Sequence, residues 1–185
     1  MNLHQVALHD CPPLPWRNGG GLTRELLAWP APQRWQLRVS VARIDCSGPF
    51  SPFSGVQRWF SVLSGEGVQL DLPRGVVTQT PADDPLAFDG EAAPMCTLLD
   101  GPTEDLNLMA PRDAGQARLQ RARPGSGIER ATRWRGLFAV DPALLDIGER
   151  TEGIAAHTLV WTDDAEAAPW TLHRGSRAFW LSLEA

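Results

Sequence analysis

Residues 58–72 read Arg-Trp-Phe-Ser-Val-Leu-Ser-Gly-Glu-Gly-Val-Gln-Leu-Asp-Leu, and they hold two strands joined by a turn. Residues 58–63 are rich in β-branched and aromatic side chains, which favour extended backbone. Residues 68–72 alternate apolar and polar side chains, the spacing at which successive side chains point to opposite faces of a strand. The link at residues 64–67 carries two glycines, and a short glycine-containing link between two such runs predicts a β-hairpin.

A second clear strand precedes this stretch, at residues 35–41. Its side chains divide into an apolar face and a polar face: Trp35, Leu37, Val39 and Val41 form the first, and Gln36, Arg38 and Ser40 form the second. Because a strand with strict alternation buries one face and not the other, we expect Arg38 and Ser40 to face the interior of a barrel. The apolar set is then expected to pack outward against other elements.

The rest of the chain is divided into short segments by 16 prolines and 17 glycines, as in many-stranded antiparallel proteins. Further strands are expected at residues 76–80, 95–99, 106–110, 117–122, 137–140, 157–162 and 177–183. Residues 81–94 are expected to form a loop with a strand fragment at 86–88, and residues 142–147 a turn of helix. This pattern predicts an all-β protein, either a sandwich or a barrel.

Length and charge limit what the chain can be. Its 185 residues suit one domain or two tightly fused halves. A net charge of −5 argues against a nucleic-acid-binding protein, which needs a basic face, and the cluster Arg130, Arg133 and Arg135 fits a solvated strand face. No apolar run approaches the length of a membrane span and no signal-peptide pattern opens the sequence, so we expect no membrane contact and a cytoplasmic location.

The sequence contains no pattern typical of a metal site, a disulfide framework or a Schiff-base lysine. The three cysteines, Cys11, Cys46 and Cys96, are odd in number and widely spaced, which fits buried thiols better than disulfides or a zinc site. The four histidines, His4, His9, His157 and His173, are never paired at His-x-His spacing. The chain has no lysine, which excludes a Schiff base. We therefore expect no metal and no cofactor, and we assign no catalytic residue.

The most distinctive stretch is residues 15–25, Pro-Trp-Arg-Asn-Gly-Gly-Gly-Leu-Thr-Arg-Glu. Three consecutive glycines allow positive φ angles and a close approach of the backbone to other groups. One interpretation is a loop that offers backbone N–H groups and the Asn18 and Thr23 side chains to an anion. The other is a tight turn before a strand. A nucleotide phosphate loop is excluded, because no Gly-Lys-Ser/Thr follows.

Residues 48–67 contain a glycine, an approach segment and a strand that ends in an aliphatic-x-Gly turn. This order resembles the first sequence block of cupins. Metal-binding cupins place two histidines and a glutamate in that block and a third histidine further along. None of these ligands stands in the matching positions here, so the resemblance does not extend to a metal-dependent enzyme.

Taken together, these blocks resemble the HutD/Ves family of bicupin proteins. The resemblance rests on residues 15–25, 35–42, 48–58, 63–67 and 100–109. It implies two cupin-like β-barrels in one globular unit. The segmentation of the chain places the junction between halves near residues 125–127, so we expect approximate halves 1–122 and 128–185, with strand exchange between them allowed. The resemblance also implies an association with histidine degradation or stress responses, without an established enzymatic activity.

Several residues in these blocks have a chemical reason to line a pocket. Arg38 and Arg58 can each bind a carboxylate through two N–H groups and stay charged when partly buried. The remaining candidates are neutral polar groups, carboxylates and aromatic rings: Asn18, Thr23, Ser40, Asn107, Glu25, Glu66, Phe50 and Phe53. The two glutamates could pair with the arginines or bind a cationic ligand group. Each residue also has a plain structural interpretation as a surface charge, an ion pair or core packing.

Three functional hypotheses remain open. The leading one is a non-enzymatic binding protein for a small anionic metabolite of the formiminoglutamate, formylglutamate or urocanate type. The second is a metal-independent cupin enzyme acting on a small acid. The third is a protein that binds a partner through exposed tryptophans such as Trp134, Trp161, Trp170 or Trp180. The sequence leaves an oligomer open.

Overall fold

The computed structural model describes residues 2–128 and 132–184, and these form nineteen strands and three short 3-10 segments. The 3-10 segments are η1 (Leu8–Asp10), η2 (Pro32–Arg34) and η3 (Gly90–Ala92). Within the described residues there is no α-helix, and none of the helical segments is long and apolar enough to cross a membrane. The all-β prediction is therefore confirmed.

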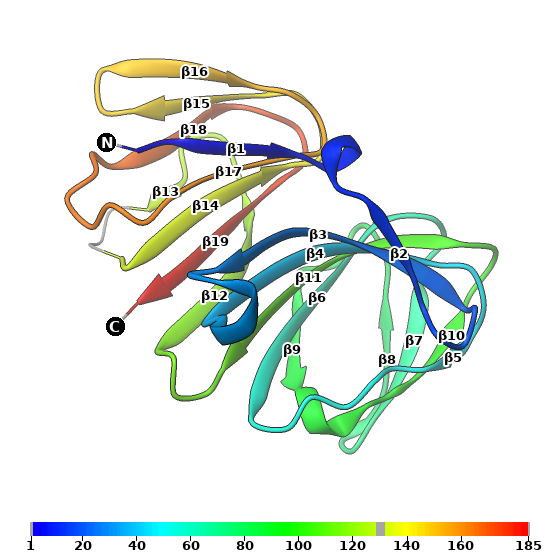
Figure 1. The fold of residues 1–185 in the computed structure, drawn as a ribbon. Coiled ribbons are helices and arrows are strands. Elements are labelled where there is room, and N and C mark those ends of the chain that lie inside the picture. The colour runs from blue at the N-terminus through cyan, green and yellow to red at the C-terminus, as the bar shows by residue number, and fades with distance from the viewer. Residues whose placement is uncertain (1, 129–131, 185) are drawn as a thin grey trace. The chain divides into compact units, whose positions relative to one another are not determined.

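The chain divides into two compact units (Figure 1). The central unit is Pro12–Ala114, and the terminal unit combines Met1–Cys11 with Gly115–Ala185. This division differs from the expected halves 1–122 and 128–185. The N-terminal strand β1 (His4–Ala7) pairs with β17 (Thr158–Thr162), and β12 (Gln116–Ala122) pairs with β19 (Ala178–Glu184), so both join the C-terminal part of the chain.

The central unit contains two sheets. The order of the six-stranded sheet is β2 (Pro13–Pro15), β3 (Gly21–Trp29), β4 (Leu37–Ile44), β11 (Thr103–Pro111), β6 (Val56–Ser64), β9 (Leu86–Asp89). The order of the four-stranded sheet is β5 (Gly48–Pro49), β10 (Met95–Leu98), β7 (Val68–Leu72), β8 (Gly75–Gln79). Apolar side chains from both sheets meet in one core, which includes Phe60, Val62, Val68, Leu70 and Cys96.

The stretch at residues 58–72 forms two strands as predicted, but the predicted hairpin pairing is wrong. Strand β6 pairs with β11 and β9, whereas β7 pairs with β8 and β10 in the other sheet. The turn carries the chain from one sheet to the other because its two glycines lie against other strands. A Cβ on Gly65 would stand 2.5 Å from the Pro102 carbonyl oxygen, and one on Gly67 would stand 2.3 Å from that of Gln79.

Strand β4 confirms the expected division into two faces. Leu37, Val39 and Val41 are each at most 3% exposed and lie on the face away from the central cavity described below. Arg38 and Ser40 lie on the cavity face. Trp35 precedes the strand and is half-buried, so it is not part of the alternating set.

The terminal unit also contains two sheets. The order of the five-stranded sheet is β1, β17, β14 (Trp134–Ala139), β19, β12. The order of the four-stranded sheet is β13 (Gly127–Ile128), β18 (Trp170–Arg174), β15 (Ala143–Ile147), β16 (Arg150–Ile154). Its core joins side chains of both sheets, among them Leu137, Val160, Leu145, Trp170 and Leu172.

The turn of helix predicted at residues 142–147 is wrong, because β15 occupies that segment. Its side chains alternate between buried and more exposed positions, with Ala143, Leu145 and Ile147 buried. Strand β15 pairs with β16 on one side and β18 on the other. The alternation of buried and exposed positions covers only five residues of a mostly apolar segment, so the sequence did not distinguish a strand from a turn of helix there.

Candidate functional site

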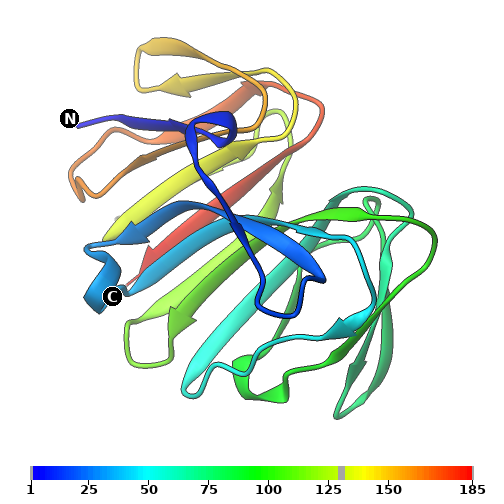
Figure 2. The ribbon, with the colours of Figure 1, turned by 45° about the vertical axis from the view of Figure 1, so that its right-hand side comes forward.

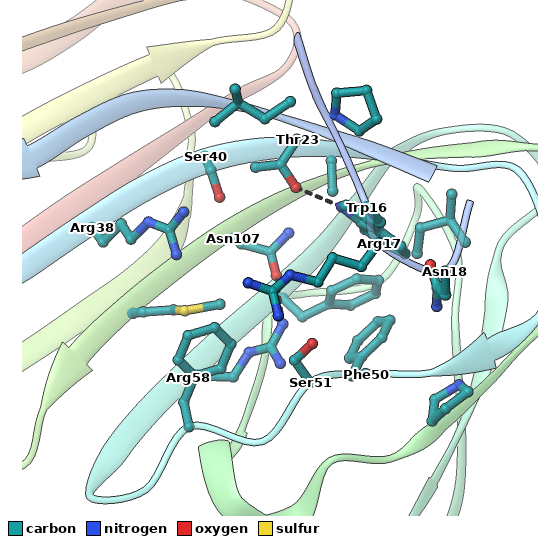
Figure 3. A pocket seen from close by; sticks show the side chains of 18 residues that line it. Trp16, Arg17, Asn18, Thr23, Arg38, Ser40, Phe50, Ser51, Arg58 and Asn107 are labelled. Carbon is teal, nitrogen blue, oxygen red and sulfur yellow. Dashed lines mark hydrogen bonds between the residues drawn. The ribbon is translucent and has the colours of Figure 1, made fainter. Parts of the chain in front are cut away.

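A cavity of about 450 Å³ lies inside the central unit (Figure 3). Its volume is within the usual range for a small-molecule site. Eighteen residues line it: Leu14, Pro15, Trp16, Arg17, Asn18, Thr23, Arg38, Ser40, Ala42, Ile44, Pro49, Phe50, Ser51, Phe53, Arg58, Phe60, Asn107 and Met109. Strands β3, β4, β11 and β6 form one wall, and the segments before β3 and around β5 complete it.

The register of three neighbouring strands brings the central polar residues together. Met109 of β11 stands opposite Arg38 of β4 and Arg58 of β6. Two residues earlier on β11, Asn107 stands opposite Ser40 and Phe60. Because residues opposite one another in an antiparallel sheet point to the same face, these side chains all project into the cavity.

Arg58 is the most unusual group of the site. It is 5% exposed, and its guanidinium lies 5.0, 5.6 and 5.2 Å from the ring centroids of Phe50, Phe53 and Phe88. Its Nη2 donates a hydrogen bond to Asn107 Oδ1 at 3.1 Å, and its Nε is buried without a partner. Among the described residues no carboxylate forms a salt bridge with it. Burial, and secondarily the charge of Arg38, lower the pKa of Arg58 to about 10.

The charge of Arg38 is neutralised by a salt bridge, whereas Arg58 has none within the described residues. Its Nε donates a hydrogen bond to Glu25 Oε2 at 2.6 Å, and both side chains are partly exposed. Glu25 itself is not among the residues that line the cavity. Of the two alternatives left open for Glu25, the structure shows the ion pair with an arginine, and Arg38 retains N–H groups that can reach a ligand.

The segment before β3 supplies the remaining polar groups. Trp16 Nε1 donates to Thr23 Oγ1 at 2.8 Å, so these two lining residues hold one another in place. Asn18 Oδ1 accepts a hydrogen bond from the Gly20 backbone N–H at 3.0 Å, which commits that oxygen to a local turn. The Arg17 side chain extends over the cavity toward Asn107 and Arg58 (Figure 3).

The structure brings together eight of the ten residues selected from the sequence: Asn18, Thr23, Arg38, Ser40, Phe50, Phe53, Arg58 and Asn107. Glu25 adjoins the cavity through Arg38. Glu66 is not brought to it, because it lies exposed in the turn between β6 and β7. Sequence reasoning did not select Arg17, Trp16, Ser51 or Met109, although Trp16 and Arg17 stand in the quoted stretch 15–25 and Ser51 lies between the two selected phenylalanines.

A second cavity lies in the terminal unit, with a volume of about 640 Å³. It is lined by Pro124, Pro142, Ala143, Leu144, His173, Arg174, Gly175 and Ser176. Its ionisable side chains, His173 and Arg174, are exposed, and His173 Nδ1 lies 3.0 Å from Asp146 Oδ2. A buried charged group is the stronger mark of a binding site, so the central cavity is the candidate. Among residues 2–128 and 132–184, no three His, Cys, Asp or Glu side chains gather as a metal site would require.

Asp105 is a second buried ionisable group of the central unit. It is 0% exposed, accepts a hydrogen bond from Thr103 Oγ1 at 3.0 Å on Oδ2, and has no partner on Oδ1. Burial raises the pKa of Asp105 well above its usual value. Asp105 also contributes to raising the pKa of the buried Cys96 thiol to about 12, although burial is the larger cause.

We predict that Asp105→Asn stabilises the protein increasingly as the pH rises. The unfolded chain loses the Asp105 proton near pH 4, whereas the folded chain holds it to a higher pH. Stability is therefore lost between those two pKa values, and asparagine removes this loss. Thermal unfolding at pH 4, 6 and 8 measures the effect, with the exposed Asp71→Asn as control. A difference from wild type that does not change with pH would contradict the prediction.

Comparison with known proteins gives consistent matches. The model of the HutD family matches residues 8–180. An uncharacterized 21.2 kDa protein in the hutC 3' region of Pseudomonas putida is 37% identical over 120 residues, 64% of this chain and 63% of that protein. The protein Ves of Citrobacter koseri is 36% identical over 107 residues, 57% of this chain and 56% of that protein. The matched region thus spans less than two thirds of either relative.

Solved structures extend the likeness to the whole chain. A conserved protein of unknown function from Pseudomonas aeruginosa PAO1 superposes with a TM-score of 0.89 at 28% identity, covering 100% of both chains. HutD from Pseudomonas fluorescens SBW25, in a formate condition, gives 0.87 at 26% identity, covering 99% of this chain and 98% of that one. The bacterial pirin YhhW from Escherichia coli gives 0.61 at 11% identity, covering 99% of each, which shows a shared fold alone. The cupin-like fold expected from the sequence is confirmed.

Proposed function

The chain belongs to the HutD family, and from this premise we propose that its central unit binds a small carboxylate metabolite without converting it chemically. The single observation that carries the proposal is Arg58, a buried cation that no carboxylate of the described chain neutralises. A buried charge without an opposite charge beside it is costly, so a buried cation at the wall of a cavity supports binding of a ligand of opposite charge.

The composition of the cavity wall favours binding over catalysis. Its described lining includes three arginines, two serines, a threonine and two asparagines, but no aspartate, glutamate, histidine or cysteine. General acid–base catalysis and nucleophilic catalysis need such groups within hydrogen-bond reach of the substrate. Glu25, the nearest carboxylate to the arginines, is already held by Arg38. The enzymatic hypothesis therefore has less support than binding.

The partner-binding hypothesis has less support as well. It requires an exposed surface of tryptophans, but Trp134 and Trp170 are 0% exposed and Trp180 is 5% exposed. Trp161 is partly buried and stacks on His4 at a centroid distance of 4.1 Å. These side chains act as core and packing residues in the terminal unit.

The relatives suggest which carboxylates to test. The curated relative from Pseudomonas putida is named for its position beside hutC, and a solved relative is HutD itself. We therefore propose an intermediate of histidine degradation of the formiminoglutamate, formylglutamate or urocanate type, bound to modulate that pathway or a stress response. One carboxylate would bind Arg58 and Arg38. Asn18, Thr23 and Asn107 would bind the nitrogen-bearing end.

We predict that wild-type protein binds at least one of these metabolites more tightly than 1 mM, and that Arg38→Ala weakens this binding about ten- to a hundredfold. A charge-assisted hydrogen bond contributes roughly 1.5–3 kcal/mol, and each 1.4 kcal/mol changes affinity tenfold. Isothermal titration calorimetry with each metabolite measures both. Arg43→Ala is the matched control, because Arg43 lies on the same strand but outside the cavity.

Two results would count against the proposed function. One is a wild-type protein that binds none of the three metabolites below millimolar concentration, which would favour partner binding again. The other is an Arg38→Ala variant that binds as tightly as wild type. Thermal unfolding of Arg38→Ala and Arg43→Ala tests whether a loss of binding comes from a loss of fold.

A further inference from the structure

The cavity is bordered on one side by a proline-rich strap, which we define as residues 12–21. Figure 2 shows this dark-blue segment crossing over the strands of its unit before it turns back into β3. It contributes Leu14, Pro15, Trp16, Arg17 and Asn18 to the cavity wall. A large share of the lining therefore comes from one short piece of chain at the edge of the six-stranded sheet.

The strap is attached mainly at Trp16, Gly20 and Gly21, and its proline-rich first residues form few backbone hydrogen bonds. Its strand β2 pairs with β3, but Pro12, Pro13 and Pro15 have no N–H, so little of the ladder can form. Trp16 N donates to Gly21 O at 2.9 Å, and Gly20 O accepts from Asp45 N and Cys46 N at 2.9 and 3.2 Å. Arg17 and Asn18 lie exposed in the turn between these fastenings.

The charges around the cavity do not balance. Arg17, Arg38 and Arg58 line it, and Glu25 neutralises Arg38. Within the described residues, neither Arg17 nor Arg58 has a salt bridge, and Arg17 has no hydrogen bond through its side chain. A ligand with one carboxylate can neutralise Arg58, which is the buried cation, but it leaves the second positive charge over the cavity unmatched.

We propose that Arg17 determines specificity by binding a second anionic group of the ligand, so that the site prefers dicarboxylates to monocarboxylates. This inference rests on the proposed function, in which Arg58 binds the first carboxylate. Arg17 is exposed, and its side chain extends across the cavity toward Arg58 and Asn107 (Figure 3). Its planar guanidinium can bind a carboxylate by donating hydrogen bonds from two N–H groups.

The exposed position of Arg17 sets the expected size of the effect. A surface charge is screened by water and salt, so its contribution is smaller than that of the buried Arg58. We expect a preference of about tenfold for the dicarboxylate, which corresponds to one modest charge-assisted contact. We expect Arg17→Gln to leave the strap folded, because the hydrogen bonds that attach the strap are made by Trp16, Gly20 and Gly21.

The test compares glutarate with pentanoate, which have five carbons each and differ in one carboxylate. Wild type should bind glutarate about tenfold more tightly than pentanoate in calorimetric titrations at physiological ionic strength. Arg17→Gln should weaken glutarate binding about tenfold and change pentanoate binding less than twofold. Arg74→Gln is the matched control, because it removes an equal charge from an exposed turn of the same unit, outside the cavity.

The outcomes separate this inference from the proposed function. If wild type binds the two acids equally, or if Arg17→Gln weakens both to the same extent, the specificity role of Arg17 is refuted while carboxylate binding stands. If wild type does not bind glutarate, the specificity role of Arg17 is refuted, and if it also binds none of the three metabolites, the proposed function fails with it. The inference is supported if Arg17→Gln loses the preference for glutarate over pentanoate while Arg74→Gln keeps it.

Discussion

Arg58→Met is expected to abolish carboxylate binding and to leave the protein slightly more stable than wild type. Binding should fall more than a hundredfold, because a buried guanidinium that holds a carboxylate through two N–H groups contributes two charge-assisted hydrogen bonds. Methionine is shorter than arginine but has a similar volume and an apolar, flexible, unbranched side chain, so it can fill much of the space among Phe50, Phe53 and Phe88.

The gain in stability follows from the sign of the pKa shift. The pKa of Arg58 is lowered from its usual value to about 10 in the folded state, chiefly because burial disfavours its charged form. The penalty is fully present at any pH below that value and corresponds to ~3 kcal/mol. The three aromatic rings and the bond to Asn107 offset much of it. A net gain of ~1 kcal/mol should raise Tm by about 2–4 °C.

Calorimetric titration and differential scanning calorimetry check the two halves of this prediction on the same sample. Arg34→Met is the matched control, because Arg34 is exposed and does not line the cavity. A fall in Tm of several degrees for Arg58→Met would show that the guanidinium is a structural element rather than a binding group. Retained binding would place the ligand elsewhere.

Gly21→Ala is expected to destabilise the protein by ~3 kcal/mol or more. A Cβ at this position would stand 2.2 Å from the Arg43 carbonyl oxygen, 3.2 Å from its carbon and 3.3 Å from Ile44 Cα. All three atoms belong to the backbone of β4, so no side chain can rotate away, and β3 and β4 would have to separate where they begin to pair. The strap would lose its anchor at the same point.

The expected fall in Tm for Gly21→Ala is about 6–12 °C for a chain of this length. Gly48→Ala is the control, since a Cβ on Gly48 would meet nothing within 4 Å. That variant should stay within about 0.5 kcal/mol of wild type. Equal destabilisation by the two substitutions would contradict the prediction, because only a Cβ on Gly21 would meet the backbone of β4.

The strands that could be predicted are those whose residues alternate over a sufficient length. At residues 35–41 and 68–72 the alternating sequence predicted both a strand and its two faces. A buried face and an exposed face impose a period of two on neighbouring residues. For residues 15–25 the sequence left open an anion-binding loop or a tight turn before a strand, and in the structure β3 follows the glycine run. Only the position of β4 shows that Gly21 allows a close contact between strands.

The sequence by itself determined the all-β class, the family and most of the chemical groups of the cavity, because these depend on local patterns and on short motifs. The tertiary structure decided which groups meet. Asn107 and Arg58 are 49 residues apart, and they touch because β11 pairs with β6 in one particular register. Glu66 lies exposed in the turn after β6, away from the cavity, and β7 joins the other sheet by pairing with β10 and β8. Register and burial arise from contacts between distant segments, so no local pattern could show that Arg58 is buried without a carboxylate partner.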